Sequence, residues 1–236
     1  MIIKPKDRLI FALDVPSLKE VKKWVRLLKG YVGVFKVGKE LFTACGPKVI
    51  DIIHQSGGKV FLDLKFHDIP NTAAKAGAVA ARLGVKMFNV HTLGGLDMME
   101  AVRKAVDKTC KKKRRPTILG VTILTSMNEK AMKEVGIQGP VKKRVMHLAG
   151  LAKKAGFDGV VASPLEAKDI KKRFGKDFII VTPGIRMPDS KPDDQNRTMT
   201  PKQAIAAGAD YIVVGRPIRE AKDPVEAANK ILEEMR

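Results

Sequence analysis

Ionisable residues follow several apolar runs of this sequence at the point where each run ends. Asp14 ends the run FALD, Lys36 ends VFK, and Asp63 and Lys65 close VFLDLK, with Asp68 three residues farther on. If these runs are β-strands, alternation along a strand turns Asp63 and Lys65 toward the same side. Carboxylates stabilise an ammonium group between them, and that group can stabilise a developing anion and donate a proton. The types and spacing of these residues therefore predict that they meet in a functional site.

Each of these residues also has a structural explanation. Asp14 could cap a helix, although Ser17 and Glu20 already have the spacing of a capping box there. Lys36 could be a solvated strand end. The D-x-K-x-x-D pattern of residues 63–68 could be chance clustering in a chain with 30% charged residues. The convergence of three strand ends on one barrel mouth favours the functional interpretation.

A second candidate site follows the last apolar run. Gly215 and Arg216 precede Pro217 at the start of the final helical segment. In an α/β barrel the loops after strands seven and eight commonly bind phosphate through backbone N–H groups, and the arginine fork adds donors. An ordinary helix start would give the same three letters, so the position of the motif carries the prediction.

Motifs for metal binding and for other common nucleophiles or nucleotide sites are missing. His54, His67, His91 and His147 lack the spacing of zinc ligands, and Cys45 and Cys110 lack C-x-x-C spacing. The sequence contains no G-x-S-x-G, P-loop lysine motif or Rossmann glycine fingerprint. We expect no metal site and two free thiols.

Eight short apolar runs supply the elements that must position these residues. Most are continuous in Val, Ile, Leu and Phe, which is typical of parallel strands covered on both faces. The predicted strands are residues 9–13, 32–37, 60–64, 87–90, 118–123, 159–162, 178–181 and 211–214. Segments with helical spacing separate them, such as Val21, Trp24, Val25 and Leu28.

Helix boundaries agree with this βα alternation. Ser17 to Glu20, Ser163 to Glu166 and Thr200 to Gln203 have capping-box spacing, and glycines at 84, 156 and 208 stand where helices would end. Eight such units in 236 residues, without a linker, predict one (β/α)8 TIM barrel over residues 1–236. A polar segment at 186–199, after the seventh strand, is predicted to be a lid over the site.

The charge balance leaves two classes of partner open. Lys and Arg total 45 against 25 Asp and Glu, a net charge of +20 that suits nucleic acid or anionic small molecules. Base-stacking aromatics are not interleaved with the cations, so we favour a solvated basic surface without nucleic-acid binding. No apolar stretch is long enough for a membrane span and the start lacks a signal-peptide cleavage site, which predicts a cytoplasmic protein without membrane contact.

The segment DLKFHDIPNT at residues 63–72 resembles the signature decapeptide of orotidine 5′-phosphate decarboxylases. Further matching segments are FALD at 11–14, FKVGKE at 35–40, VTILTS at 121–126, VTPGIR at 181–186 and VGRPI at 214–218. They follow in order along nearly the whole chain. The resemblance implies a cofactor-free decarboxylase of the pyrimidine nucleotide pathway that acts as a homodimer.

The resemblance also implies roles for individual residues. Lys65 would donate the proton, Asp63 would lie beside the substrate carboxylate, and Lys36 with Asp14 would bind the ribose hydroxyls. The remaining substrate contacts would come from Thr125 at the pyrimidine, from Gln195, Gly215 and Arg216 at the phosphate with Arg186 at the same end, and from Asp68, Ile69 and Thr72 of the neighbouring subunit.

Decarboxylation of orotidine 5′-phosphate would require such a site to stabilise a carbanion. Loss of CO2 from C6 of the orotate ring leaves the negative charge in the plane of the ring, where the π system cannot delocalise it, so a positioned ammonium must stabilise it. We expect repulsion between Asp63 and the substrate carboxylate to be secondary. Two alternatives stay open: a Mg2+-dependent sugar-phosphate decarboxylase or synthase on the same barrel, and a non-enzymatic nucleic-acid binder.

Overall fold

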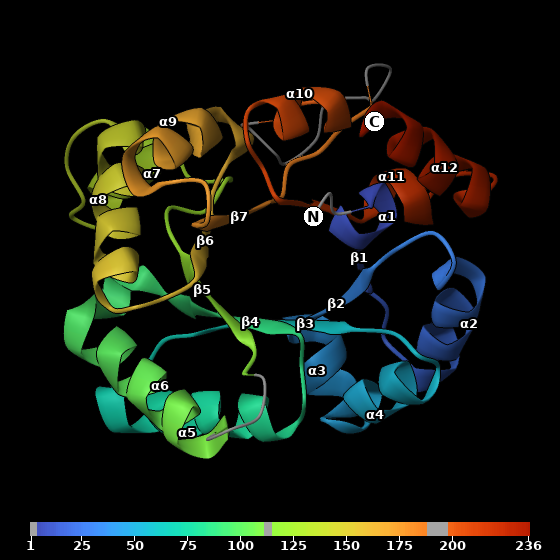
Figure 1. Cartoon of the computed structure of the whole chain (residues 1–236), viewed down its shortest axis with the longest axis horizontal. Helices are drawn as coiled ribbons and strands as arrows, with labels where there is room; N and C mark the ends of the chain where they lie inside the picture. Colours follow the sequence, from blue (N-terminus) through green and yellow to red (C-terminus); the bar gives the residue numbers. More distant parts are fainter. Residues whose placement is uncertain (1–3, 111–114, 188–197) are drawn as a thin grey trace.

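The computed structural model of the chain describes residues 4–110, 115–187 and 198–236. These residues form eight parallel strands that close into a barrel in sequence order (Figure 1). The strands are β1 (Leu9–Ala12), β2 (Val34–Gly38), β3 (Val60–Phe66), β4 (Met87–His91), β5 (Thr117–Val121), β6 (Gly159–Val161), β7 (Ile179–Thr182) and β8 (Tyr211–Val214). The predicted TIM barrel is confirmed.

Helices form a ring outside the barrel (Figure 1). In the described residues they are α1 (Pro5–Arg8), α2 (Leu18–Leu28), α3 (Lys39–Cys45), α4 (Lys48–Gln55), α5 (Pro70–Arg82), the 3-10 turn η1 (Thr92–Gly94), α6 (Gly95–Cys110), α7 (Glu129–Glu134), α8 (Val141–Lys154), α9 (Pro164–Phe174), α10 (Pro201–Ala206), α11 (Arg216–Arg219) and α12 (Pro224–Glu234). None of the helices in the described ranges combines the length and apolar character that crossing a bilayer requires.

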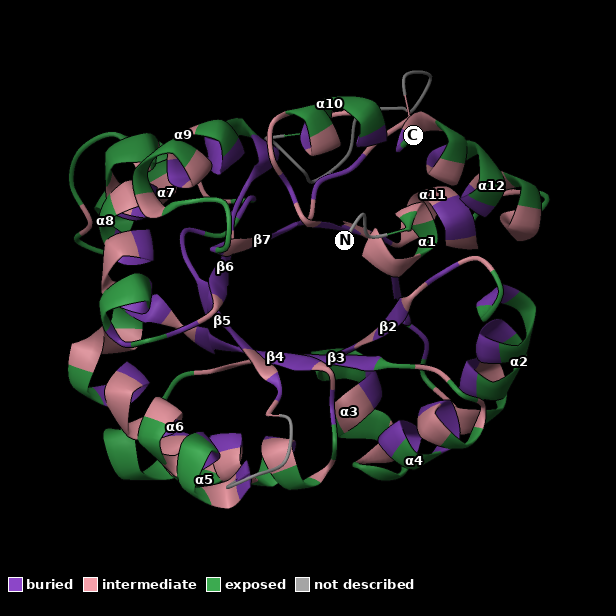
Figure 2. Ribbon diagram, viewed as in Figure 1, coloured by how far each residue is buried: buried purple, intermediate pink, exposed green. Residues whose placement is uncertain are grey.

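Side-chain alternation along the strands builds two apolar layers. One side of the strands points to the barrel axis, where Ile10, Val34, Phe61, Met87 and Leu119 belong to one buried cluster. The other side packs against the helices in a larger cluster that includes the strand neighbours Phe11, Phe35, Leu62 and Phe88. Figure 2 shows the resulting barrel of buried strands inside helices whose outer faces are exposed. The barrel is a packed core, and its open end offers the space for a ligand.

Helix ends follow the predicted chemistry with one refinement. Thr200 and Gln203 form a complete capping box. Ser17 accepts the backbone N–H of Glu20 and its hydroxyl also donates to the Glu20 side chain at 3.4 Å, whereas Ser163 accepts the backbone N–H of Leu165. Gly84, Gly156 and Gly208 have φ between 69° and 106°, the left-handed region that lets a helix end before the next strand. Two of the three predicted boxes are therefore single N-caps.

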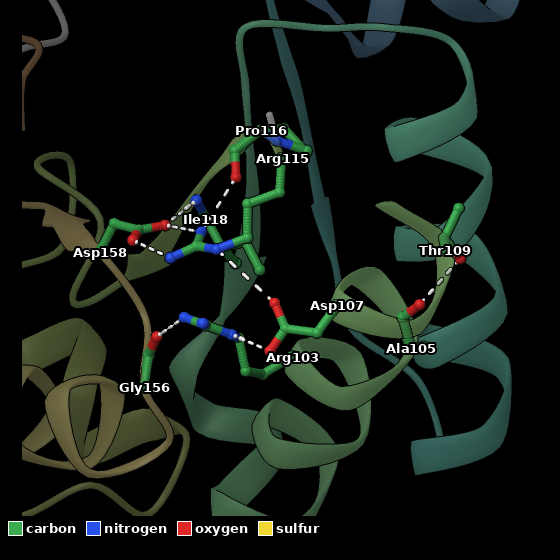
Figure 3. Close-up of polar contacts among 9 residues, drawn as sticks. All are labelled: Arg103, Ala105, Asp107, Thr109, Arg115, Pro116, Ile118, Gly156 and Asp158. Atoms are coloured by element: carbon green, nitrogen blue, oxygen red, sulfur yellow. Dashed lines mark hydrogen bonds and ion pairs between the residues drawn. The ribbon is translucent and has the colours of Figure 1, made fainter. Parts of the chain in front are cut away.

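Acidic residues fasten neighbouring strands at the amino-terminal face of the barrel, opposite the mouth. The Asp158 carboxylate accepts two hydrogen bonds of 2.6 Å from the Arg115 guanidinium and one of 2.8 Å from the backbone N–H of Ile118 in β5 (Figure 3). Asp210 likewise accepts the backbone N–H of Ile180 in β7 and pairs with Lys171. Each aspartate precedes its own strand and so ties it to the adjacent strand and to a cation.

Candidate active site

The carboxyl ends of the strands surround a cavity of about 460 Å3. Most of the predicted site residues line it, and they come from loops that are far apart in sequence. They are Asp14, Lys36, Asp63, Lys65, Thr125, Arg186, Gly215 and Arg216. The barrel thus brings together the charged strand ends and the residues around the predicted phosphate site.

Charges alternate across the floor of this cavity. Lys36 Nζ lies 3.0 Å from Asp14 Oδ1 and 3.5 Å from Asp63 Oδ2. Asp63 Oδ1 lies 2.6 Å from Lys65 Nζ. The order Asp14, Lys36, Asp63, Lys65 follows the strands β1, β2 and β3, which pair side by side. We call these four residues the charge string.

Burial and charge compete at the two inner members of the charge string. Burial opposes ionisation of Asp63, yet the charges of Lys36 and Lys65, with hydrogen bonds from Lys65 and Asn89, hold its pKa below the ordinary value. Burial would likewise lower the pKa of Lys36, but Asp63 and Asp14 raise it above the ordinary value. Both groups are therefore charged at neutral pH.

A glycine makes room for the first pair of the string. A Cβ atom on Gly38, at the end of β2, would lie 3.0 Å from Lys36 Nζ and 3.5 Å from Asp14 Oδ1. Such an atom would press on the end of the Lys36 side chain, so glycine leaves this ion pair undisturbed.

Lys65 adopts an unusual backbone conformation. Its φ is 52°, and in the described residues it is the one non-glycine residue with positive φ. This left-handed conformation costs roughly 1–3 kcal/mol for such a residue and persists only where surrounding contacts hold it. The pairing of β3 with β4 shifts register between Leu62 and Phe66, so Lys65 lies outside the regular ladder. Strain at the end of β3 thus coincides with the predicted proton donor.

Asn89 of β4 supports this strained turn, and the sequence alone did not indicate it. Its Oδ1 accepts the Lys65 backbone N–H at 2.8 Å, and its Nδ2 donates to Asp63 Oδ1 at 2.7 Å. The one available signal was an amide inside the otherwise apolar run of residues 87–90. A buried amide in a strand needs partners, and here both lie in the charge string.

Arg219 is a second residue that sequence reasoning missed. It lines the cavity, donates to the Asp14 carbonyl at 3.0 Å and lies 3.9 Å from Asp14 Oδ2. It follows Arg216 by one turn of α11, so a second arginine in RPIR was the only signal. Asp14 is therefore held from both sides, by Lys36 and by Arg219.

His91 ends β4 beside the charge string. Burial, with the charges of His67, Lys65 and Lys39, lowers the pKa of His91 to about 4. Its ring stacks on His67 with centroids 5.3 Å apart, and its Nδ1 accepts the Leu93 N–H at 3.4 Å. The ring is neutral near pH 7 and adds no charge to the cavity.

The residues predicted to serve a neighbouring subunit lie outside the cavity of their own chain. Asp68, Ile69 and Thr72 are exposed, with 66% of Ile69 accessible, and none of the three lines the cavity. Asp68 Oδ1 accepts the backbone N–H of Ile69, and within the described residues no ion pair joins it to Lys65. The expectation that Asp68 flanks Lys65 is therefore not met within one chain, because the loop after Phe66 carries it outward.

The predicted lid is described only at its two ends. Gln195 and residues 188–197 lie outside the described residues, whereas Arg186 and Met199 lie within them. Arg186 N–H donates to the Met199 carbonyl at 3.0 Å, and Ile185 and Met199 form a parallel bridge. The two ends of the segment thus meet at the rim of the cavity, next to Gly184.

The described residues contain no group of three or more His, Cys, Asp or Glu side chains arranged to hold a metal ion. The carboxylates of Asp14 and Asp63 instead have lysine ammonium groups as their nearest charged partners. Ammonium, guanidinium and carboxylate groups line this mouth. Such an arrangement can bind an anionic substrate and stabilise negative charge at a carbon near Lys65.

Known proteins resemble the chain over nearly its whole length. A family model described as "Orotidine 5'-phosphate decarboxylase / HUMPS family" matches residues 7–231. The orotidine 5′-phosphate decarboxylase of Syntrophotalea carbinolica is 56% identical over 237 residues, which cover 100% of this chain and 97% of that protein. That of Geotalea daltonii is 55% identical, covering 98% and 96%. The crystal structure of the Lactobacillus acidophilus enzyme of that name is 39% identical, with a TM-score of 0.84 and coverage of 96% and 98%.

Proposed function

Because this chain belongs to the orotidine 5′-phosphate decarboxylase / HUMPS family, we propose that it converts orotidine 5′-phosphate to uridine 5′-phosphate and CO2 without a cofactor. Relatives more than half identical carry the name of this carboxy-lyase. The reaction is a step of pyrimidine nucleotide synthesis, and we assign it to the cytoplasm. The observation that carries the proposal is the charge string, which ends in Lys65 at the open end of the barrel.

Lys65 is the catalytic residue of this proposal. Breaking the bond between C6 and the carboxyl carbon leaves an electron pair in the ring plane, and CO2 departs. The Lys65 ammonium stabilises that pair electrostatically and then gives it a proton, which becomes the C6 hydrogen of the product. Its support is the position of Nζ, 2.6 Å from Asp63 and at the cavity wall. Preorganised charge of this kind is usually the largest single term in catalysis.

Asp63 has two tasks in the proposal. It holds the ammonium of Lys65, and its own charge, maintained by the low pKa, faces the carboxylate of the substrate. Repulsion between the two carboxylates is relieved as CO2 leaves, an effect that we rank below the stabilisation by Lys65. Lys36 and Asp14, joined at 3.0 Å, offer a donor and an acceptor to the ribose hydroxyls.

The phosphate would bind on the β7 and β8 side of the mouth, where β8 pairs with β1 and adjoins the Asp14 end of the charge string. Gly215 and Arg216 follow β8 and line the cavity, as does Arg186 after β7. Backbone N–H groups and planar guanidinium forks suit a phosphate dianion. We assign the pyrimidine contact to Thr125, which lines the cavity from the loop after β5. Gln195 completes the proposed phosphate contacts.

Dimerisation completes the site in this proposal. Asp68, Ile69 and Thr72 are exposed at the start of α5, on the side of the mouth where the charge string ends. We propose that in a homodimer they reach the partner's cavity, where Asp68 supplies a second carboxylate beside Lys65. Ile69, which is 66% exposed in the single chain, would be covered in that interface.

The direct test is the ultraviolet absorbance change of orotidine 5′-phosphate in chelator-treated buffer. We expect turnover at the same rate before and after chelation, and orotidine without its phosphate to react far more slowly, because remote phosphate binding contributes to the transition state. The family description also covers HUMPS enzymes. Activity that needs added Mg2+, or that appears only with a sugar phosphate, would instead assign the chain to the Mg2+-dependent sugar-phosphate decarboxylases or synthases.

A further inference from the structure

Asn89 occupies the middle of β4, behind the end of β3. Its side chain is 1% exposed and does not line the cavity, so it does not reach a bound substrate. A buried amide without partners would be costly, yet both ends of this amide are used. The oxygen accepts from the Lys65 backbone and the nitrogen donates to the Asp63 carboxylate.

The first contact replaces a missing strand bond. Leu62 pairs with Phe88 and Phe66 pairs with Val90, so three residues of β3 face one residue of β4, and that residue is Asn89. The bulge turns Lys65 to φ 52° and removes its N–H from the ladder. Asn89 Oδ1, at 2.8 Å, is the acceptor that satisfies this N–H.

The second contact fixes the carboxylate that holds the ammonium. Asp63 Oδ1 accepts hydrogen bonds from Asn89 Nδ2 at 2.7 Å and from Lys65 Nζ at 2.6 Å. A carboxylate with one such partner can rotate about its terminal bond, whereas one anchored by a buried amide keeps its orientation. The Asn89 amide is therefore linked to Lys65 in two ways. It bonds directly to the Lys65 backbone N–H, and it bonds to the Asp63 carboxylate that holds Lys65 Nζ.

We infer that Asn89 is a positioning residue for catalysis, which sets the Lys65 ammonium by holding the strained backbone of Lys65 and the Asp63 carboxylate together. The inference rests on the proposed role of Lys65 and adds a requirement to it. Displacing the ammonium by a fraction of an ångström leaves substrate binding intact but weakens the stabilisation of the carbanion. We therefore expect loss of Asn89 to lower kcat and to leave KM nearly unchanged.

The test compares Asn89→Ala and Asn89→Asp with a matched control, Thr92→Val. Thr92 is equally buried in η1, directly after β4, and its hydroxyl donates to the Val121 carbonyl at 2.7 Å without touching the charge string. Asn89→Ala removes both bonds. Asn89→Asp has the same shape and keeps the acceptor for Lys65 N–H, but sets a carboxylate against Asp63.

We expect kcat to fall on the order of 100-fold in both Asn89 variants, with KM within about threefold of wild type. Thr92→Val is expected to lower the unfolding temperature similarly while leaving kcat within about twofold. We also expect the acid limb of the kcat profile to move to higher pH in Asn89→Asp, because the new charge raises the pKa of Asp63. If Asn89→Ala does not fold, the isosteric Asn89→Asp carries the kinetic comparison.

Hydrogen exchange of the Lys65 amide supplies a readout that needs no substrate. We expect protection of that amide to fall at least about tenfold in Asn89→Ala and to persist in Asn89→Asp and Thr92→Val. Wild-type turnover of orotidine 5′-phosphate tests the proposed function, whereas the changes in kcat, KM and Lys65 amide protection between variants and wild type test the role of Asn89. The inference is overturned if kcat of the folded Asn89 variants stays within threefold of wild type, if kcat and KM change together, or if Lys65 protection does not depend on Asn89.

Discussion

Asp63 and Lys65 form the ion pair at the end of β3 on which the proposed chemistry depends. Alternation along a regular strand predicted that both side chains turn to one side, and Lys65 Nζ does lie 2.6 Å from Asp63 Oδ1. The reason differs, because Lys65 leaves the extended conformation with φ 52°. The pair was predictable from residue types at the end of β3. The bulge and its amide support were not, because they depend on the register between two strands.

Asp63 makes the charge string pH-dependent. Its folded pKa lies below the ordinary value of 3.8, so its contribution to stability is present above that value and is lost as pH falls through the folded pKa. We expect Asp63→Asn to lower the free energy of unfolding by roughly 3 kcal/mol at pH 7, because Lys36 and Lys65 lose their shared counter-charge.

Denaturant unfolding of wild type and Asp63→Asn measures this difference across pH. We expect it to be constant between about pH 5 and 8 and to shrink only below 3.8. Asp14→Asn, at the more exposed end of the string, is the control and is expected to cost about 1 kcal/mol or less. A difference that changes steadily between pH 8 and 5 would mean that another group dominates.

At the scale of elements, the strands were predicted more accurately than their ends. The runs at residues 9–13 and 211–214 correspond to β1 and β8, whereas β3 continues to Phe66 and β5 stops at Val121, before the predicted 123. Apolar runs mark burial, which extends into the loops at the mouth. The short helices α3, α4 and α7 carry too few turns for their periodicity to be separated from that of a loop.

The amino-terminal face provides a prediction about elements alone. Asp158 directly precedes β6 and accepts hydrogen bonds from the Ile118 N–H of β5 and from the Arg115 guanidinium (Figure 3). These bonds hold the two strands together at this end of the barrel. We expect Asp158→Ala to destabilise the fold by about 2 kcal/mol and to leave kcat unchanged. The substitution removes the acceptor of the Ile118 N–H and two of the Arg115 hydrogen bonds, while Arg115 keeps Asp107 and the Pro116 carbonyl. Thermal unfolding with parallel kinetics measures both effects.

Asp169→Ala is the matched control, because Asp169 pairs with Lys142 in an exposed ion pair at 2.7 Å. We expect its cost to be about 0.5 kcal/mol or less. Equal losses in the two variants, or a fall in kcat with Asp158→Ala, would contradict the assignment of this face to stability alone.

At the scale of the whole molecule, one chain holds an incomplete version of the proposed site. The cavity contains Asp63 beside Lys65, whereas Asp68 is exposed and belongs to the proposed interface. Spacing alone did not separate these two aspartates, because Asp63 lies in β3 and Asp68 follows that strand by only two residues. Only the family resemblance assigned Asp68 to the neighbouring subunit. Only a few of the cations behind the net charge of +20 line the cavity, namely Lys36, Lys65, Arg186, Arg216 and Arg219.

Complementation tests whether two chains share a site. We expect Lys65→Ala and Asp68→Asn to be nearly inactive separately and to regain activity when mixed under conditions that exchange subunits. Each heterodimer has one site with both residues intact, so random pairing restores about a quarter of all sites. The measurement is decarboxylation before and after exchange, with heterodimers verified by mass. Verified heterodimers without recovered activity would reject the shared site.

The central claim is that the Lys65 ammonium stabilises and protonates the carbanion. The most direct measurement is single-turnover decarboxylation by Lys65→Ala in chelator-treated buffer, with uridine 5′-phosphate binding measured on the same preparation and Lys142→Ala as an exposed-lysine control. We expect Lys65→Ala to lose at least about 10⁴-fold in rate while its unfolding temperature and product affinity stay near wild type, and Lys142→Ala to retain full activity. A folded Lys65→Ala protein that binds the product and turns over at near wild-type rate would contradict the claim.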